Sequence, residues 1–202
     1  MRFFKDNSYD IVKLFVNQIG IAIFSMVLNL AVNSMGDKSF SLGLSIAISV
    51  FSVLFYCSLL YNVAWEYGAK DKIHIDANKA VLDNVKGFKM ALFASLPNFF
   101  ISLLALFFGV IYMISSLDFA AVISGVANFF MRMLMSMYHG IIHSIFGGFD
   151  SVSDASFLGA AAVYFFVSAI AIAVVHIGYT FGSRELKIFA FVTEKNDKHN
   201  NK

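Results

Sequence analysis

The sequence predicts an all-α, multi-pass integral membrane protein with four transmembrane helices and one long amphipathic helix. Of its 202 residues, 59% are hydrophobic and only 14% are charged, whereas charged residues make up about 25% of a typical soluble domain. Apolar stretches recur that reach the roughly 20 residues a helix needs to cross a bilayer. A single proline agrees with long helices. We therefore expect one transmembrane domain, with the lipid bilayer as its first partner.

Four apolar stretches are predicted to span the membrane: residues 14–33, 41–64, 90–114 and 157–178. The first follows a short basic segment, as in a signal peptide, but it exceeds the apolar core of about 7–15 residues that signal peptides have. We expect it to remain as a span.

Two of these stretches carry a polar face. In the first, Gln18, Ser25 and Asn29 recur on one side. In the second, hydroxyl groups repeat every three or four residues, at Ser41, Ser45, Ser49, Ser52 and Tyr56. Polar side chains inside a membrane are expected to face neighbouring helices, where they find hydrogen-bond partners. These faces are predicted to meet within the bundle.

The third span contains Pro97, followed by Asn98. Proline cannot donate a backbone hydrogen bond and frees a carbonyl about one turn earlier. The pair therefore predicts a helix kink, with the Asn98 side chain available to compensate the exposed backbone.

Residues 118–146 predict a long amphipathic helix. At about 100° per residue, its polar residues fall within an arc of roughly 120°. This polar stripe consists of Ser124, Asn128, Arg132, Ser136, His139 and His143, and Asp118 and Asp150 continue it on the same face at its two ends. The helix is predicted to lie in the membrane interface, or to enter the bilayer as a re-entrant hairpin broken near Gly125 or Gly140. The alternative is a fifth transmembrane helix.

The distribution of basic residues favours four spans. With four spans, the N-terminal segment, the loop 66–89 and the tail 184–202 lie on one side and contain 13 of the 15 Lys and Arg residues. Cytoplasmic segments of membrane proteins carry such an excess. The sequence thus predicts a protein of the cell (plasma) membrane with both termini in the cytoplasm. Frequent Lys, Asn and Phe suggest a bacterial source.

Two similar segments follow the second and last spans. Gly68, Lys70 and Asp71 stand in one, and Gly182, Arg184 and Glu185 stand in the other, each after an aromatic residue. The pair predicts a cytoplasmic motif that closes each half of a duplicated unit, with coincidence as the alternative.

One reading of the stripe is an outward-facing metalloenzyme. His139 and His143 are four residues apart and share a helical face, and Asp150 lies on the same stripe. This spacing is used by helical zinc sites, although the H-E-x-x-H signature is absent. Outside this reading, we expect no enzyme activity and no cofactor.

The sequence is compatible with two other functions. The first expectation is a non-enzymatic accessory or assembly subunit, possibly of a transporter, acting with a protein partner or as a homo-oligomer. The alternative is a small transporter of solutes or lipid headgroups whose pathway uses the stripe around Arg132, together with Asn29 and His176. A net charge of only +2 gives no indication of a nucleic-acid partner.

Overall fold

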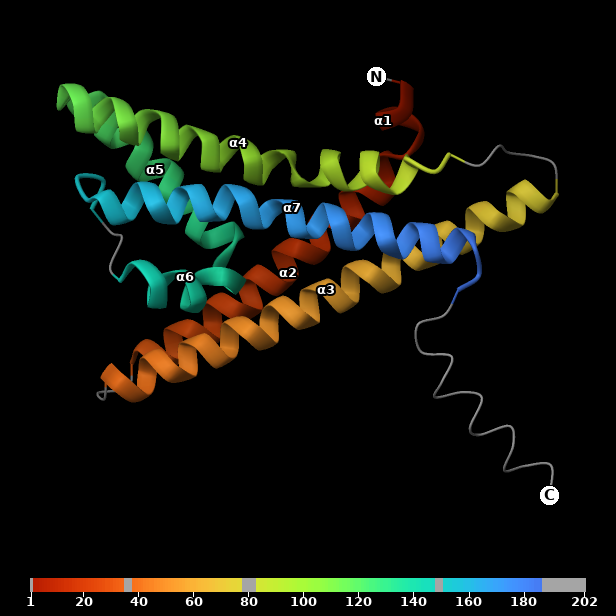
Figure 1. The fold of residues 1–202 in the computed structure, drawn as a ribbon, viewed down its shortest axis with the longest axis horizontal. Helices are drawn as coiled ribbons and strands as arrows, with labels where there is room; N and C mark the ends of the chain where they lie inside the picture. The colour runs from red at the N-terminus through yellow and green to blue at the C-terminus, as the bar shows by residue number, and fades with distance from the viewer. Residues whose placement is uncertain (1, 35–37, 78–82, 148–150, 187–202) are drawn as a thin grey trace.

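The computed structural model describes residues 2–34, 38–77, 83–147 and 151–186, and within these ranges every regular element is helical (Figure 1). The elements, in chain order, are α1 (Arg2–Asp6), α2 (Ser8–Asn33), α3 (Lys38–Asp76), α4 (Lys86–Ser115), α5 (Asp118–Leu134), the 3₁₀ turn η1 (Ser136–Tyr138), α6 (His139–Phe146) and α7 (Ala155–Ser183). The prediction of an all-α fold is confirmed.

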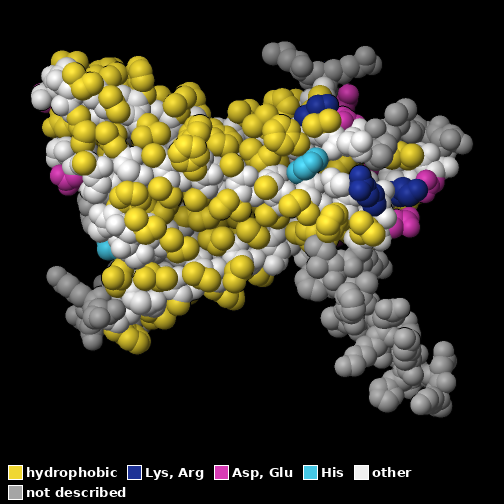
Figure 2. Space-filling view, viewed as in Figure 1, with side chains coloured by type: hydrophobic (Ala, Val, Ile, Leu, Met, Phe, Trp, Pro, Cys, Tyr) yellow, Lys and Arg dark blue, Asp and Glu magenta, His cyan; other side chains and the backbone are white. Residues whose placement is uncertain are grey.

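Four helices, α2, α3, α4 and α7, are long and apolar enough to cross a membrane. Between 22% and 39% of the most apolar 18-residue window of each is buried within the bundle. Many of the remaining apolar side chains are exposed, and they cover much of the face of the bundle seen in Figure 2. Such a surface is the one that a membrane-embedded bundle presents to lipid.

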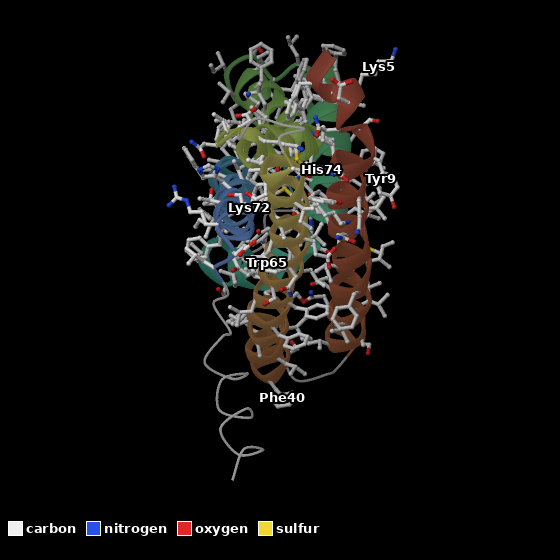
Figure 3. The ribbon with its side chains drawn as sticks, turned by 90° about the vertical axis from the view of Figure 1, so that its right-hand side faces the viewer. Lys5, Tyr9, Phe40, Trp65, Lys72 and His74 are labelled. Atoms are coloured by element: carbon white, nitrogen blue, oxygen red, sulfur yellow. The ribbon has the colours of Figure 1, made fainter. Side chains whose placement is uncertain are left out.

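The helices form two pairs that run in the same sense (Figure 1). Helices α2 and α4 run away from the end of the bundle that holds α1, whereas α3 and α7 run back toward it. We call this the basic end, because most of the described Lys and Arg side chains gather there (Figure 2): Lys5, Lys13, Lys70, Lys72, Lys86, Lys89 and Arg184. Viewed from this end, Lys5 and Tyr9 project outward from the bundle (Figure 3).

Polar contacts tie three helices together at the basic end. Lys86 of α4 donates to both carboxylate oxygens of Asp71 on α3, at 3.0 and 2.7 Å. The hydroxyl of Tyr179 on α7 donates to the same carboxylate at 2.7 Å. Beyond α3, Lys89 contacts Asp83 at 3.0 Å, and this hydrogen bond holds the pKa of the Asp83 carboxyl below its ordinary value.

The structure corrects two boundaries. The hydrophilic connection expected from residue 66 is helical as far as Asp76, because α3 continues beyond its apolar part. The single amphipathic helix expected over residues 118–146 is wrong: α5 and the segment Ser136–Phe146 are bent by 80° relative to each other. The break covers Met135 and the 3₁₀ turn Ser136–Tyr138, so it lies directly before Gly140, one of the two positions expected for a broken hairpin, and away from Gly125.

Candidate functional site

Helices α5 and α6 form a hairpin that enters the bundle from the end opposite the basic end (Figure 1). The N-terminus of α5 and the C-terminus of α6 both lie at that end, and the bend lies inside the bundle. We refer to α5, η1 and α6 together as the hairpin.

Side chains of α2 stabilise the bend. A helix break frees backbone carbonyls, which are costly to leave unpaired in an apolar surrounding. Gln18 donates to the Leu134 carbonyl at 3.3 Å, and Ser25 donates to the Ser136 carbonyl at 3.2 Å. The Ser136 hydroxyl in turn donates to the Ala22 carbonyl. The polar face predicted on α2 therefore contacts protein, as expected.

Helices α3 and α4 hold the two arms of the hairpin. The Gly140 backbone N–H donates to the Ser49 hydroxyl at 2.8 Å, and a Cβ at position 140 would clash with the Ser45 carbonyl. On the other arm, Ser124 donates to the Ala105 carbonyl of α4 at 2.9 Å. Ser124, a predicted stripe residue, thus serves packing between α4 and α5.

A cavity of about 490 Å³ lies between α2 and the hairpin. Ten residues line it: Met26, Asn29, Leu30, Gly125, Asn128, Phe129, Arg132, Met133, Ser136 and His139. Its volume falls within the range of roughly 300–1,000 Å³ that is typical of small-molecule sites. We call it the polar cavity, because five of these side chains are polar.

The two asparagines of the polar cavity differ in their bonding. Asn29 is fixed: its amide donates to the Ser25 carbonyl at 2.9 Å, and its oxygen accepts from Ser45 at 2.6 Å. Asn128 is 6% exposed, and its side-chain oxygen has no hydrogen-bond partner among the described residues. A buried acceptor in this state costs about 1–3 kcal/mol. That oxygen has almost no accessible surface, so Asn128 borders the cavity without presenting its acceptor to it.

Arg132 brings a permanent positive charge to the polar cavity, where its side chain is partly buried. Its planar guanidinium can bind a carboxylate or phosphate through two parallel hydrogen bonds. His139 and Ser136 lie on the same wall, and the Ser136 hydroxyl already donates its hydrogen to the Ala22 carbonyl. The chemistry of this cavity suits an anionic group.

The mouth of the cavity is apolar. Leu30 on α2 is 61% exposed, and Phe129 on α5 is 65% exposed. Both side chains belong to the outer apolar surface of the bundle as well as to the cavity wall. The polar cavity therefore borders the surface that lipid would cover.

Four of the six stripe residues, namely Asn128, Arg132, Ser136 and His139, line the polar cavity. His143 lies beside His139, with ring centroids 5.7 Å apart, but outside the cavity lining. His176, expected near the stripe, lies on α7 with its ring 6.4 Å from that of Phe88. The sequence analysis did not identify Met26, Leu30 and Phe129 as lining residues. The only indication in the sequence is that Leu30 follows Asn29 and Phe129 follows Asn128.

Of the three ligands expected for a metal site, the structure places two, His139 and His143, next to each other. Asp150, the third expected ligand, lies outside the described residues. Within the described part of the chain, no group of three or more His, Cys, Asp or Glu side chains is placed to hold a metal ion.

Pro97 lies within α4, which continues through it. We expected the Asn98 side chain to bond the backbone carbonyl that Pro97 frees in the same helix, but it bonds another helix instead. Its side chain and that of Gln18 form a reciprocal pair of hydrogen bonds, both 2.9 Å long, between α4 and α2. Tyr56 of α3 contacts the same Gln18 oxygen at 3.4 Å.

The two glycines of the predicted cytoplasmic motif lie at the crossing of α3 and α7. A Cβ on Gly68 would clash with the Tyr179 carbonyl, and a Cβ on Gly182 would clash with the Trp65 carbonyl. Each glycine thus meets the residue three positions before the other. Of the charged residues, Asp71 joins the polar contacts described above, Lys70 lies 5.9 Å from the Tyr67 ring, and Arg184 and Glu185 are exposed.

Comparison with known proteins gives no relative. No family model, curated protein or solved structure matches this chain. The functional argument rests on the polar cavity and on the hairpin that forms it.

Proposed function

We propose that this chain is a four-span protein of the bacterial cell membrane, with the basic end in the cytoplasm and the hairpin re-entrant from the outer side. The segregation of Lys and Arg to one end supports this orientation. The common position of both hairpin termini at the opposite end supports re-entrance over a fifth span. Both termini of the chain are then cytoplasmic.

The function we propose is the binding of an anionic solute or lipid headgroup in the polar cavity, as the recognition step of a small transporter. The observation that carries it is the convergence of Arg132, Asn128, Ser136 and His139 with Asn29 around one space. An arginine at mid-bilayer costs at least about 2.5–3.5 kcal/mol on insertion scales. A cavity that admits water or an anion offsets this cost.

The test is thermal unfolding of the full chain in mild detergent, with inorganic phosphate, glycerol 3-phosphate or phosphatidylglycerol as probes. Binding to the folded state alone raises stability by about 2.7 kcal/mol at a hundredfold excess over Kd. We expect at least one probe to raise Tm in the wild type and not in Arg132→Gln. Lys72→Gln, at the exposed basic end, is the matched control and should respond as the wild type does.

If Arg132→Gln responds as the wild type does, or if no probe has any effect, the proposal is wrong. The accessory-subunit function would then lead. It stays a prediction, and its test is whether a protein partner copurifies with the chain in stoichiometric amount.

A further inference from the structure

Two apolar stripes line the polar cavity, one on each of the helices that enclose it. On α2 the stripe consists of Met26 and Leu30, and on α5 it consists of Gly125, Phe129 and Met133. In both helices the members are four residues apart, so they lie on one face of the helix. The cavity therefore has an apolar side as well as a polar one.

This apolar side opens onto the surface of the bundle that lipid would cover. Leu30 is 61% exposed and Phe129 is 65% exposed, one on each side of the cavity. At 1.5 Å per residue, Leu30 lies about 5 Å and Gly125 about 10 Å along their helices from the end opposite the basic end. In the proposed orientation this is the outer half of a hydrocarbon core about 30 Å thick, where acyl chains are the surrounding medium.

Gly125 keeps the space between the stripes open. A Cβ added to it would meet nothing within 4 Å, and its backbone is not in the left-handed region that favours glycine. Gly140 differs, because a Cβ there would meet the Ser45 carbonyl. Glycine inside a helix is destabilising relative to alanine, and at position 125 neither backbone conformation nor close packing requires it. What Gly125 provides is room beside the apolar stripes.

The polar side chains next to the stripes leave this space to an apolar occupant. Asn29 has both its amide group and its oxygen bonded within the bundle. The Ser136 hydroxyl donates to the Ala22 carbonyl, and the Asn128 oxygen has almost no accessible surface. A water molecule between apolar stripes lacks the roughly two to four polar partners that hold buried water, whereas an acyl chain needs none.

We propose that one acyl chain of an outer-leaflet phospholipid lies between the two apolar stripes and enters from the bilayer past Leu30 and Phe129. The cavity volume of about 490 Å³ is many times the roughly 30 Å³ that one water molecule occupies in the liquid, so it accommodates a segment of chain. This inference depends on the membrane placement proposed above, but not on an anion at Arg132.

The test is photo-crosslinking of the full chain in vesicles that contain a phosphatidylcholine with a diazirine in one acyl chain. Met26, partly buried and on the cavity wall, reports the space between the stripes. Val27, the next residue, is 57% exposed and outside the cavity lining, so it reports ordinary contact with lipid at the same depth. We expect labels at both residues. A label at Val27 without one at Met26 would overturn the proposal.

Gly125→Leu fills the space from the side of α5. We expect this variant to lose the label at Met26 and to keep the label at Val27, which also shows that it is folded in the membrane. Gly20→Leu on α2 is the matched control, because a Cβ at position 20 also meets nothing within 4 Å but lines no part of the cavity. It should keep both labels. Equal labelling of Met26 in the two variants would overturn the proposal.

Two further arms separate the source of the chain and the role of the polar wall. An excess of unlabelled phosphatidylcholine should reduce the label at Met26, whereas a small proportion of palmitic acid should not. Displacement by palmitic acid would give the space to a free fatty acid and overturn the proposal. Arg132→Gln should label Met26 as the wild type does. This result would leave the inference standing even if the anion-binding function fails, whereas loss of the label would mean that the charged wall holds the lipid and would overturn the inference.

Discussion

At the scale of single residues, the amide pair of Gln18 and Asn98 has the clearest energetic consequence. Each side chain donates to the other at 2.9 Å in the buried interior, and Gln18 also donates to the carbonyl freed at the hairpin bend. We expect Asn98→Leu to lower stability by about 1–3 kcal/mol, because the buried Gln18 amide loses its two shortest hydrogen bonds and keeps only the longer contacts with Leu134 and Tyr56. The measurement is the midpoint of thermal unfolding in detergent.

A double-mutant cycle separates this pair from general packing damage. In Gln18→Leu with Asn98→Leu, both partners become apolar, so we expect part of the loss to be recovered. Hydrogen bonds between membrane helices couple by about 0.6 kcal/mol on average, with values up to about 1.7. Strictly additive losses would show that the two amides do not depend on each other.

At the scale of elements, close contact between α6 and α3 holds the hairpin in place. Gly140 lies against the Ser45 carbonyl, leaving no room for a Cβ. We expect Gly140→Ala to destabilise the fold and to weaken ligand binding, because α6 must move away from α3 and carries His139 with it. Gly43→Ala is the control: its Cβ meets nothing within 4 Å. Removing a helical glycine there should be neutral or stabilising by up to about 1 kcal/mol. Equal effects in the two variants would contradict the packing argument.

The hairpin also marks the limit of what sequence could predict. Hydropathy and periodicity predicted the apolar helices and the polar faces of α2 and α3, because burial in a membrane imposes those patterns locally. The bend at Met135 has no such signal: neither Gly nor Pro stands there, and the spacing of Asn128, Arg132, Ser136 and His139 keeps helical periodicity through it. The break is stabilised by Gln18, Ser25 and Ser49, all more than 80 residues away. A local pattern cannot report such partners.

The same limit applies to the candidate site. The stripe predicted four of the polar residues that line the cavity, but not the cavity itself, which requires α2 and α5 to lie apart around Gly125 and Met26. Helix separation depends on packing across the bundle, so composition and spacing do not determine it.

At the scale of the whole molecule, two pairs of contacts relate the first two long helices to α4 and α7. Gln18 and Asn98, on α2 and α4, bond to each other from positions 80 residues apart. Gly68 and Gly182, on α3 and α7, each approach the residue three before the other. This is the arrangement expected of a duplicated helical pair with the hairpin inserted in the second copy. The duplication stays a prediction.

The contact between α3 and α7 at Gly68 and Gly182 allows a test of this symmetry. Because a Cβ at either position would meet a backbone carbonyl of the other helix, Gly68→Ala and Gly182→Ala should lower Tm by similar amounts. Gly20→Ala, whose Cβ would meet nothing within 4 Å, serves as control. A large loss in one variant and none in the other would contradict an equivalent role for the two glycines.

The central claim is that the hairpin is re-entrant: it enters the bundle from the end opposite the basic end and forms the polar cavity against α2. Cysteine accessibility in intact cells tests it most directly, on a Cys57→Ala background with single cysteines at Ser116, Ser153 and Asn84. Ser116 precedes the hairpin, Ser153 follows it, and Asn84 lies between α3 and α4 near the basic end. An impermeant maleimide should label Ser116→Cys and Ser153→Cys, but not Asn84→Cys. Labelling of only one of the two positions that flank the hairpin would make it a broken transmembrane span, and the account would be wrong.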